Sequence, residues 1–176
     1  MDKIILIILS EIDVRFIGVL NRSMEYIFHR PVETRYNITN MGYAYDAARK
    51  QYKSPLLLAR LRRIKKSPAE KIMAVTDVDL YSPGYDFIYG EADVRAGVAT
   101  LSINRLVSDI KGPQSNLRIN DERIIREATH EMGHLFGLIH CSNPKCVMRT
   151  CTCLPEVDEA AGGLCAVCYK KLQPNL

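Results

Sequence analysis

The chain opens with an uninterrupted apolar run and continues with a segment whose apolar residues recur at helical spacing. Residues 4–9 are all aliphatic, which is typical of a strand buried on both faces of a sheet. Between Asp13 and His29 the apolar residues recur every three or four positions. Pro31 ends this segment, because the residue before a proline avoids helical backbone angles. The pattern therefore predicts a buried strand followed by a helix.

The same pattern predicts further helices and strands along the chain. Helical spacing at residues 46–66 predicts a second helix, with Pro55 marking a break or a restart, and a third helix begins near Asp121. Strand-like runs occupy residues 32–36, 71–78, 87–91 and 97–103, and residues 165–172 predict a short final helix. The order of these elements predicts an α/β chain with a mixed sheet, followed by an irregular, cysteine-rich tail.

Composition and charge change this picture little. With 176 residues, of which 47% are hydrophobic and 25% charged, the chain matches one globular domain with a small appendage. The net charge of +4 comes largely from a basic cluster at residues 60–66, which favours a solvated helix face over contact with nucleic acid. The opening apolar run is too short for a signal peptide or a membrane span, so we expect a cytoplasmic protein without a membrane partner.

Three of the four histidines lie between residues 130 and 140. His130 and His134 are four apart on the predicted helix, so both imidazoles point from one face toward a single ion. Glu131 stands one step round the helix, where a base acting on metal-bound water must lie. Gly137 can end the helix sharply, so that His140 arrives from the returning chain as a third ligand. Three imidazoles leave one position of a zinc ion open for water, which is the mark of a catalytic site.

The six cysteines predict metal ligands or buried thiols, because disulfides are rare in the cytoplasm. Cys165 and Cys168 have the spacing of a zinc knuckle, in which two thiolates bind one ion. Four ligands can be chosen from six cysteines in fifteen ways, so spacing alone leaves the other two ligands open. Cys151 and Cys153 are either reduced thiols, or one of them replaces Cys146 as a ligand.

The histidine motif, His130-Glu131-x-x-His134-x-x-Gly137-x-x-His140, together with Met148, resembles the metzincin clan of zinc metallopeptidases. The added cysteines make the last forty or so residues similar to the archaemetzincin family, although the gap from Met148 to Cys165 is one residue short. This resemblance implies a metzincin-like α+β fold with a mixed, mainly parallel twisted sheet of about five strands and three main helices. We expect an N-terminal subdomain over residues 1–137, with the sheet and the active-site helix. The methionine turn and a structural zinc site would then belong to a C-terminal subdomain over residues 138–176.

The resemblance also implies two zinc ions in each chain, one catalytic and one structural. The ligands that it implies for the catalytic zinc are His130, His134 and His140. Those that it implies for the structural zinc are Cys141, Cys146, Cys165 and Cys168. Met148 would lie in the methionine turn beneath the catalytic zinc. Because Cys141 adjoins His140, a single tether would then orient both sites.

The expected activity is that of a zinc metalloprotease, which hydrolyses peptide bonds in a peptide or protein substrate. A zinc-bound water would attack the carbonyl, with Glu131 as general base that later passes the proton to the leaving amine. Thr150 stands where some clan members carry a tyrosine that assists the reaction. By position and by resemblance, the substrate would pair as an extended strand with a sheet edge. The residues expected at this edge are Phe87, Ile88, Tyr89 and Gly90.

Two other functions fit parts of the same pattern. Certain endoribonucleases that mature ribosomal RNA carry three histidines at this spacing, and the basic cluster would suit RNA. They lack a glutamate after the first histidine and they lack the cysteine tail, so Glu131 is the discriminating residue. A catalytically inactive zinc-binding or interaction protein is the other alternative, because an intact ligand set does not prove turnover.

Overall fold

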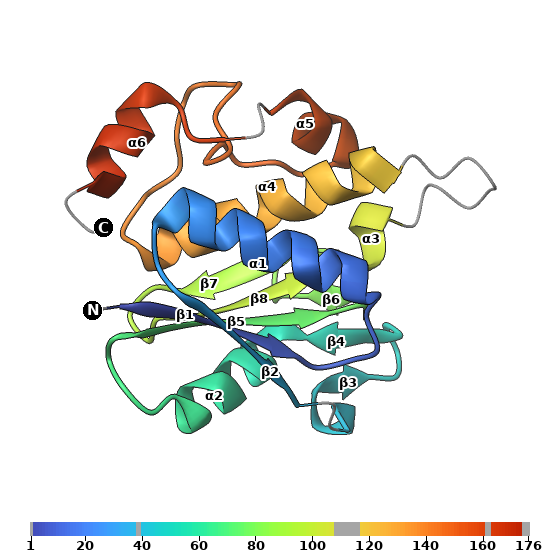
Figure 1. The fold of residues 1–176 in the computed structure, drawn as a ribbon. Helices are drawn as coiled ribbons and strands as arrows, with labels where there is room; N and C mark the ends of the chain where they lie inside the picture. The colour runs from blue at the N-terminus through green and yellow to red at the C-terminus, as the bar shows by residue number, and fades with distance from the viewer. Residues whose placement is uncertain (1, 38–39, 108–116, 161–162, 174–176) are drawn as a thin grey trace.

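A five-stranded mixed sheet forms the centre of the computed structural model, which describes residues 2–37, 40–107, 117–160 and 163–173 (Figure 1). The strands in chain order are β1 (Lys3–Ile8), β2 (Val32–Tyr36), β3 (Tyr45–Asp46), β4 (Gln51–Lys53), β5 (Glu70–Thr76), β6 (Leu80–Tyr81), β7 (Gly90–Asp93) and β8 (Val98–Ser102). The main sheet has the order β2-β1-β5-β8-β7, with every neighbouring pair parallel except β7 and β8. The prediction of a mixed, mainly parallel sheet is therefore confirmed.

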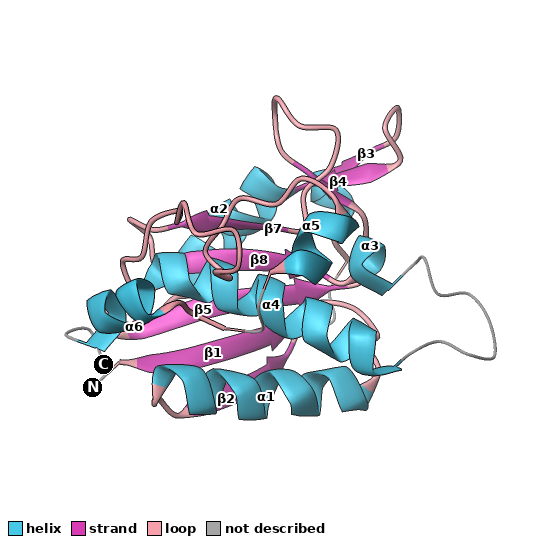
Figure 2. Cartoon of the chain, turned by 90° about the horizontal axis from the view of Figure 1, so that it is seen from above, coloured by secondary structure: helices cyan, strands magenta, loops and turns pink. Residues whose placement is uncertain are grey.

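Helices cover both faces of this sheet. They are α1 (Val14–Phe28), α2 (Ser54–Ile64), α3 (Asn104–Val107), α4 (Leu117–Leu135), α5 (Leu154–Glu159) and α6 (Ala166–Leu172), with a 3-10 turn at Gly42–Ala44. Figure 1 shows α1 and α4 on one face and α2 on the other. The C-terminal segment with α5 and α6 lies over the outer side of α4, as the second view also shows (Figure 2). No helix in the described ranges is long and apolar enough to cross a membrane.

The first strand is buried on both faces, as its composition predicts. Ile4, Leu6 and Ile8 join the apolar cluster beneath α1 and α4. Ile5 and Ile7 point the other way, into the cluster beneath α2. This alternation follows from the two-residue period of a strand, so every side chain of the run finds an apolar partner. The predicted helix between Asp13 and His29 is also confirmed, with Asp13 as its N-cap and His29 as its C-cap.

The prediction of one helix over residues 46–66 is wrong in its first half. The carboxylate of Asp46 accepts the backbone N–H of Ala48, and Lys50 adopts a left-handed conformation with φ 55°. These contacts turn the chain into the β3–β4 hairpin, which joins β6 in a small second sheet. The helix α2 then starts with Pro55 in its first turn. The backbone N–H groups of a first turn have no partner within the helix, so a proline there removes no hydrogen bond.

The strand predicted at residues 87–91 is displaced along the chain. Only Gly90 and Glu91 of that segment belong to β7, which continues to Asp93. The preceding Ile88 instead donates its N–H to the carbonyl of Leu80 at 2.9 Å, in an isolated bridge outside the main sheet. The helix predicted to begin near Asp121 is α4, which begins four residues earlier, at Leu117. The elements β3, β4, β6, α3 and α5 lack a predicted counterpart.

The tertiary arrangement leaves β7 at an edge of the main sheet, beside α4. Figure 1 shows α4 crossing above β7 and β8, and α4 contacts both strands. Gly137, just after α4, has φ 87°, so the chain turns sharply at this point. The turn coincides with the boundary expected between residues 137 and 138, and the division into two subdomains stays a prediction.

Candidate metal centres

The three clustered histidines converge on one point at the end of α4. His130 and His134 lie one turn apart on this helix, and the N–H of Leu138 bonds to the carbonyl of Gly133 at 2.9 Å as the helix ends. The chain then returns, and His140 joins the other two. One ring nitrogen from each histidine lies within 4.8 Å of the others. The structure thus brings together the three side chains that the sequence motif singles out.

Backbone carbonyls orient two of these imidazoles. The Nδ1 atom of His130 lies 2.9 Å from the carbonyl oxygen of Val147, and that of His134 lies 2.8 Å from the carbonyl oxygen of Leu138. A carbonyl only accepts hydrogen bonds, so Nδ1 carries the proton in both rings. The Nε2 atoms then present lone pairs to each other across 3.1 Å. Such carbonyl partners are typical of histidines that bind a metal.

The facing nitrogen atoms fit a zinc ion. Two lone pairs cannot form a hydrogen bond with each other, so the arrangement suits a cation bound between them. Two nitrogens about 2.05 Å from a tetrahedral zinc would be about 3.3 Å apart, close to the observed separation. Burial lowers the pKa of His130 to about 4 and also lowers the pKa of His134. Both rings therefore stay neutral near pH 7, the form that binds a metal.

Glu131 is buried next to the histidines, in a group of three carboxyl side chains. Its side chain is 5% exposed and lines the same cleft as the three imidazoles. Burial, together with the carboxylates of Glu127 and Glu91, raises its pKa well above the usual value. Glu91 accepts a hydrogen bond from Ser82 at 2.9 Å through one oxygen, and its other oxygen is buried without a partner in the described structure. Sequence reasoning missed both acids. Helical spacing could have found Glu127, which lies four residues before Glu131 on α4, whereas only the packing of α4 on β7 brings Glu91 to the motif.

Two glycines permit close packing around the histidines. A Cβ atom on Gly90 would lie 2.6 Å from Cγ of Glu131, so the absence of a side chain lets β7 approach the acid. A Cβ atom on Gly133 would lie 2.6 Å from Sδ of Met148, which is fully buried against α4. Met148 therefore packs against the helix between the two histidines. A glycine inside a helix destabilises the helix. Its presence at position 133 was therefore the sequence signal that another group packs closely against α4 there.

A cleft of about 580 Å³ is lined by the three clustered histidines and Glu131. All four residues expected at the substrate edge line it, namely Phe87, Ile88, Tyr89 and Gly90. Of these, only Gly90 belongs to the edge strand β7, which corrects the expected position of the edge. Thr150 and the half-buried Cys151 also line the cleft.

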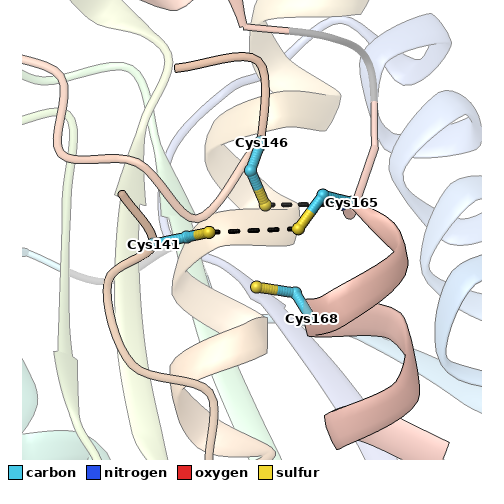
Figure 3. A group of neighbouring side chains, drawn as sticks. All are labelled: Cys141, Cys146, Cys165 and Cys168. Carbon is cyan, nitrogen blue, oxygen red and sulfur yellow. Dashed lines mark hydrogen bonds between the residues drawn. The ribbon is translucent and has the colours of Figure 1, made fainter. Parts of the chain in front are cut away.

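Four cysteines form a second cluster between the returning chain and α6. Figure 3 shows their sulfur atoms pointing toward one another, with Cys141 and Cys146 from the loop after α4 and the other two from the start of α6. The Sγ atoms of Cys141, Cys146, Cys165 and Cys168 lie within 4.8 Å of one another. Cys151 and Cys153 are outside this group, and none of the six forms a disulfide.

The geometry of the cysteine cluster also fits zinc. The Sγ atoms of Cys141 and Cys165 are 3.9 Å apart. Two thiolates about 2.3 Å from a tetrahedral zinc would be about 3.8 Å apart. The backbone N–H of Cys168 lowers the pKa of the Cys165 thiol to about 7, whereas burial raises the pKa of the thiols of Cys146 and Cys168. A cation would be required to hold the buried members as thiolates.

Comparisons of the sequence and of the structure with known proteins lead to the same family. The model of peptidase family M54 matches residues 24–174. An archaemetzincin of Pyrococcus furiosus is 34% identical, over 99% of this chain and 94% of that protein. The crystal structure of a zinc-dependent peptidase from Methanocorpusculum labreanum has a TM-score of 0.86 and 30% identity, covering 96% of this chain and 99% of that one. The crystal structure of an archaemetzincin from Methanopyrus kandleri has a TM-score of 0.85 and 30% identity, covering 99% of this chain and 94% of that one.

Proposed function

The chain belongs to peptidase family M54 and is a zinc metallopeptidase, and we propose that it hydrolyses peptide bonds at the three-histidine centre with Glu131 as general base. The observation that carries this proposal is the pair of Nε2 lone pairs facing each other across 3.1 Å, in the same cleft as a buried carboxylate. A ligand set of neutral imidazoles with a carboxylate beside it is the arrangement that metal-assisted hydrolysis needs.

His130, His134 and His140 would hold the zinc ion. When bound, the ion supplies a Lewis acid that lowers the pKa of water and polarises a carbonyl oxygen. The carbonyls of Val147 and Leu138 hold two of the rings in the tautomer that presents Nε2 to the ion. The protein thus supplies an oriented and neutral ligand set before the substrate arrives.

Glu131 would move the proton. Its carboxylate takes a proton from the attacking water and later gives that proton to the leaving amine. A raised pKa makes this carboxylate a stronger base than an ordinary one, and a zinc ion bound beside it would favour its charged form. Burial between β7 and α4 is the physical cause of that basicity.

The free edge of β7 would bind the substrate backbone. The carbonyl of Tyr89 accepts from the N–H of Ser102 on β8, and the carbonyl of Asp93 accepts from Gly97 in the turn. Backbone groups alternate in direction along a strand, so those of Gly90 and Ala92 face away from β8. They offer a peptide the hydrogen bonds of an added strand. Gly90 also places this edge against Glu131, so a paired peptide would cross the centre.

The four-cysteine cluster would hold a second, structural zinc, which makes two ions per chain. Four thiolates close the coordination shell, so this site has no position for a substrate. It would join α6 to the loop that carries His140. Because Cys141 follows His140 directly, the closed site would also fix a ligand of the open one.

Elemental analysis and peptide cleavage together test the function. We would measure zinc per chain in the wild type, His134→Ala and Glu131→Gln, and incubate each with a mixed peptide library that is read by mass spectrometry. We expect about two zinc ions in the wild type and about one in His134→Ala, without cleavage. Glu131→Gln should keep both ions and lose at least about 100-fold in rate, the typical contribution of a general base.

A histidine outside the cluster provides the matched control. His29 ends α1 in a left-handed conformation with φ 47°, so we choose His29→Asn because asparagine tolerates this conformation. This variant should keep both ions and full cleavage. A Glu131→Gln enzyme as fast as the wild type would contradict the assigned base. If no protein cleaves peptides, the peptidase assignment fails and RNA becomes the next substrate to examine.

A further inference from the structure

A second pocket lies at the end of the sheet where the strands β5 and β8 begin, and we call it the basic pocket. It has a volume of about 390 Å³ and is formed by the end of α2, the connection to β5 and the turn after β7. Its basic lining side chains are Arg62, Lys65, Lys66, Lys71 and Arg95. Among the described residues, no acidic side chain belongs to this lining. The fold therefore gathers positive charge from three separate segments into one concave place.

The charge of the basic pocket is only partly balanced by its neighbours. Arg62 pairs with Asp93 at 2.9 Å, and Lys65 donates to the carbonyl oxygen of Ala96 at 2.7 Å. Within the described ranges, the remaining three basic side chains of the pocket form no ion pair with a carboxylate. The nearby Glu70 already contacts two other basic residues outside the pocket.

Like charges repel within the pocket. Burial and the neighbouring Lys71 lower the pKa of Lys65, against the opposite influence of Glu70 and Asp2. An anion placed among these side chains would relieve the repulsion. Guanidinium groups bind carboxylates and phosphates through two parallel hydrogen bonds, and the pocket contains two of them beside its lysines.

The basic pocket adjoins the cleft of the zinc centre. Val94, which follows β7, lines both. Gly90 marks the position of Glu131 along β7, because a Cβ atom there would lie 2.6 Å from Cγ of Glu131. An extended chain rises about 3.3 Å per residue, so Val94 lies about 13 Å further along. A peptide paired with β7 would therefore reach the basic pocket about four residues from the bond to be cleaved.

We propose that the basic pocket binds an acidic residue of the peptide substrate, and so makes the enzyme selective for peptides with an anionic group about four residues from the scissile bond. This inference rests on the proposed function, since it needs a peptide along β7. The pocket would act as a specificity site that takes no part in the chemistry. A carboxylate side chain or a phosphorylated one would meet the same five cations.

The composition of the lining favours a peptide over a nucleic acid. Single-stranded nucleic acids bind to basic grooves through bases stacked on aromatic side chains. In the described part of the chain, no aromatic side chain lines the basic pocket. Its position beside the cleft, with Val94 lining both, instead matches a ligand that already lies in the cleft.

Binding without turnover tests the inference. The probes are fluorescein-labelled decapeptides with the same apolar core and three glutamates at either the N-terminal or the C-terminal end. Matched peptides carry three glutamines instead. Fluorescence anisotropy with the zinc-loaded Glu131→Gln protein gives each Kd. We expect one of the two glutamate peptides to bind at least about tenfold tighter than its glutamine match, as a few charge contacts near a protein surface would give. This advantage should shrink as salt is added.

Two double variants with the same change in net charge locate the effect. Lys66→Ser with Arg95→Ser, both in the basic pocket, should abolish most of the advantage. Arg22→Ser with Arg63→Ser, two exposed residues outside the pocket, should keep it.

Three outcomes would overturn the inference. The glutamate and glutamine peptides could bind alike, or the advantage could survive in the pocket variant. Alternatively, a twelve-residue oligouridine could depend on the pocket while the glutamate peptide does not, which would make the pocket a nucleic-acid contact. None of these outcomes depends on cleavage, so a failure here is distinguishable from a failure of the proposed function.

Discussion

At the scale of single residues, Glu127 is the side chain that the structure adds to the motif. It lies one helical turn before Glu131 on α4 and lines the same cleft. Burial raises the pKa of Glu127 to about 7 from the usual 4.5. Its carboxyl therefore holds a proton more tightly in the folded chain than in the unfolded one. Placing a second carboxyl here costs stability, and it contributes to the raised pKa of Glu131.

We expect Glu127→Gln to stabilise the protein increasingly as the pH rises. Below pH 4.5 the carboxyl is protonated in both states. Between pH 4.5 and 7 the unfolded chain releases the proton while the folded chain keeps it, so the wild type loses stability as the pH rises. The advantage of the variant in free energy of unfolding should grow by about 2 kcal/mol between pH 5 and pH 8, measured by urea denaturation.

The control for this measurement is Glu122→Gln on the same helix. Glu122 pairs with Arg118 at 3.0 Å and with Arg126 at 3.2 Å, so the same substitution is made at an ion-paired glutamate outside the acidic group of the cleft. This variant should show no advantage that grows with pH. A Glu127→Gln advantage that is equal at pH 5 and pH 8 would show that burial does not shift this carboxyl.

At the scale of elements, the edge strand β7 has two distinct sides. One side forms the ladder with β8, in which Glu91 is opposite Thr100. The other side offers the backbone groups of Gly90 and Ala92 to the cleft. The turn after β7 belongs to the basic pocket. A single four-residue strand thus connects the reacting centre with the specificity site.

We expect Ala92→Pro to weaken substrate binding without removing zinc. Proline lacks the N–H that faces the cleft, and it is tolerated on an edge strand because the ladder with β8 does not use that group. The loss of one hydrogen bond should raise KM about three- to tenfold on a peptide found in the library, with zinc content unchanged. Ala92→Ser keeps the N–H and should keep the wild-type KM. Equal KM values for all three proteins would mean that the substrate does not pair with β7.

At the scale of the whole molecule, the tail is attached to the active-site helix at two places, of which the first is the segment around His140. The N–H of Cys141 bonds to the carbonyl of Met148 at 2.9 Å, next to the Val147 carbonyl that orients His130. The tail is also attached at α5, where Asp158 accepts two hydrogen bonds from Arg123 of α4 at 2.7 and 2.6 Å. Loss of the cysteine site should therefore affect the histidine site as well.

We expect Cys165→Ser to remove the structural zinc and to weaken the catalytic one. The variant should contain at most one zinc per chain and lose at least about 3 kcal/mol in free energy of unfolding, since metal binding and folding are coupled. Its remaining zinc should pass to a chelator faster than that of the wild type. Cys153→Ser, at an exposed position outside the cluster, should match the wild type. Two tightly held ions in Cys165→Ser would contradict a structural role for this cluster.

The sequence by itself determined the features that depend on local spacing. A helix places residues four apart on one face, so His130 and His134 were predictable as a pair, and Gly137 predicted the return of the chain. The buried first strand and α1 follow from apolar periodicity. Spacing alone left the cysteine set open among fifteen choices, and only the family resemblance narrowed it to the four that lie together.

Only the tertiary structure decided the features that join distant parts of the chain. The position of β7 depends on pairing with β8 and on the bridge between Ile88 and Leu80, which no local pattern encodes. Glu91 comes to lie near Glu131, and α2 reaches the turn after β7, only because the sheet and α4 are packed together. Long-range hydrogen bonds and apolar burial select these neighbours, and both are properties of the folded chain as a whole.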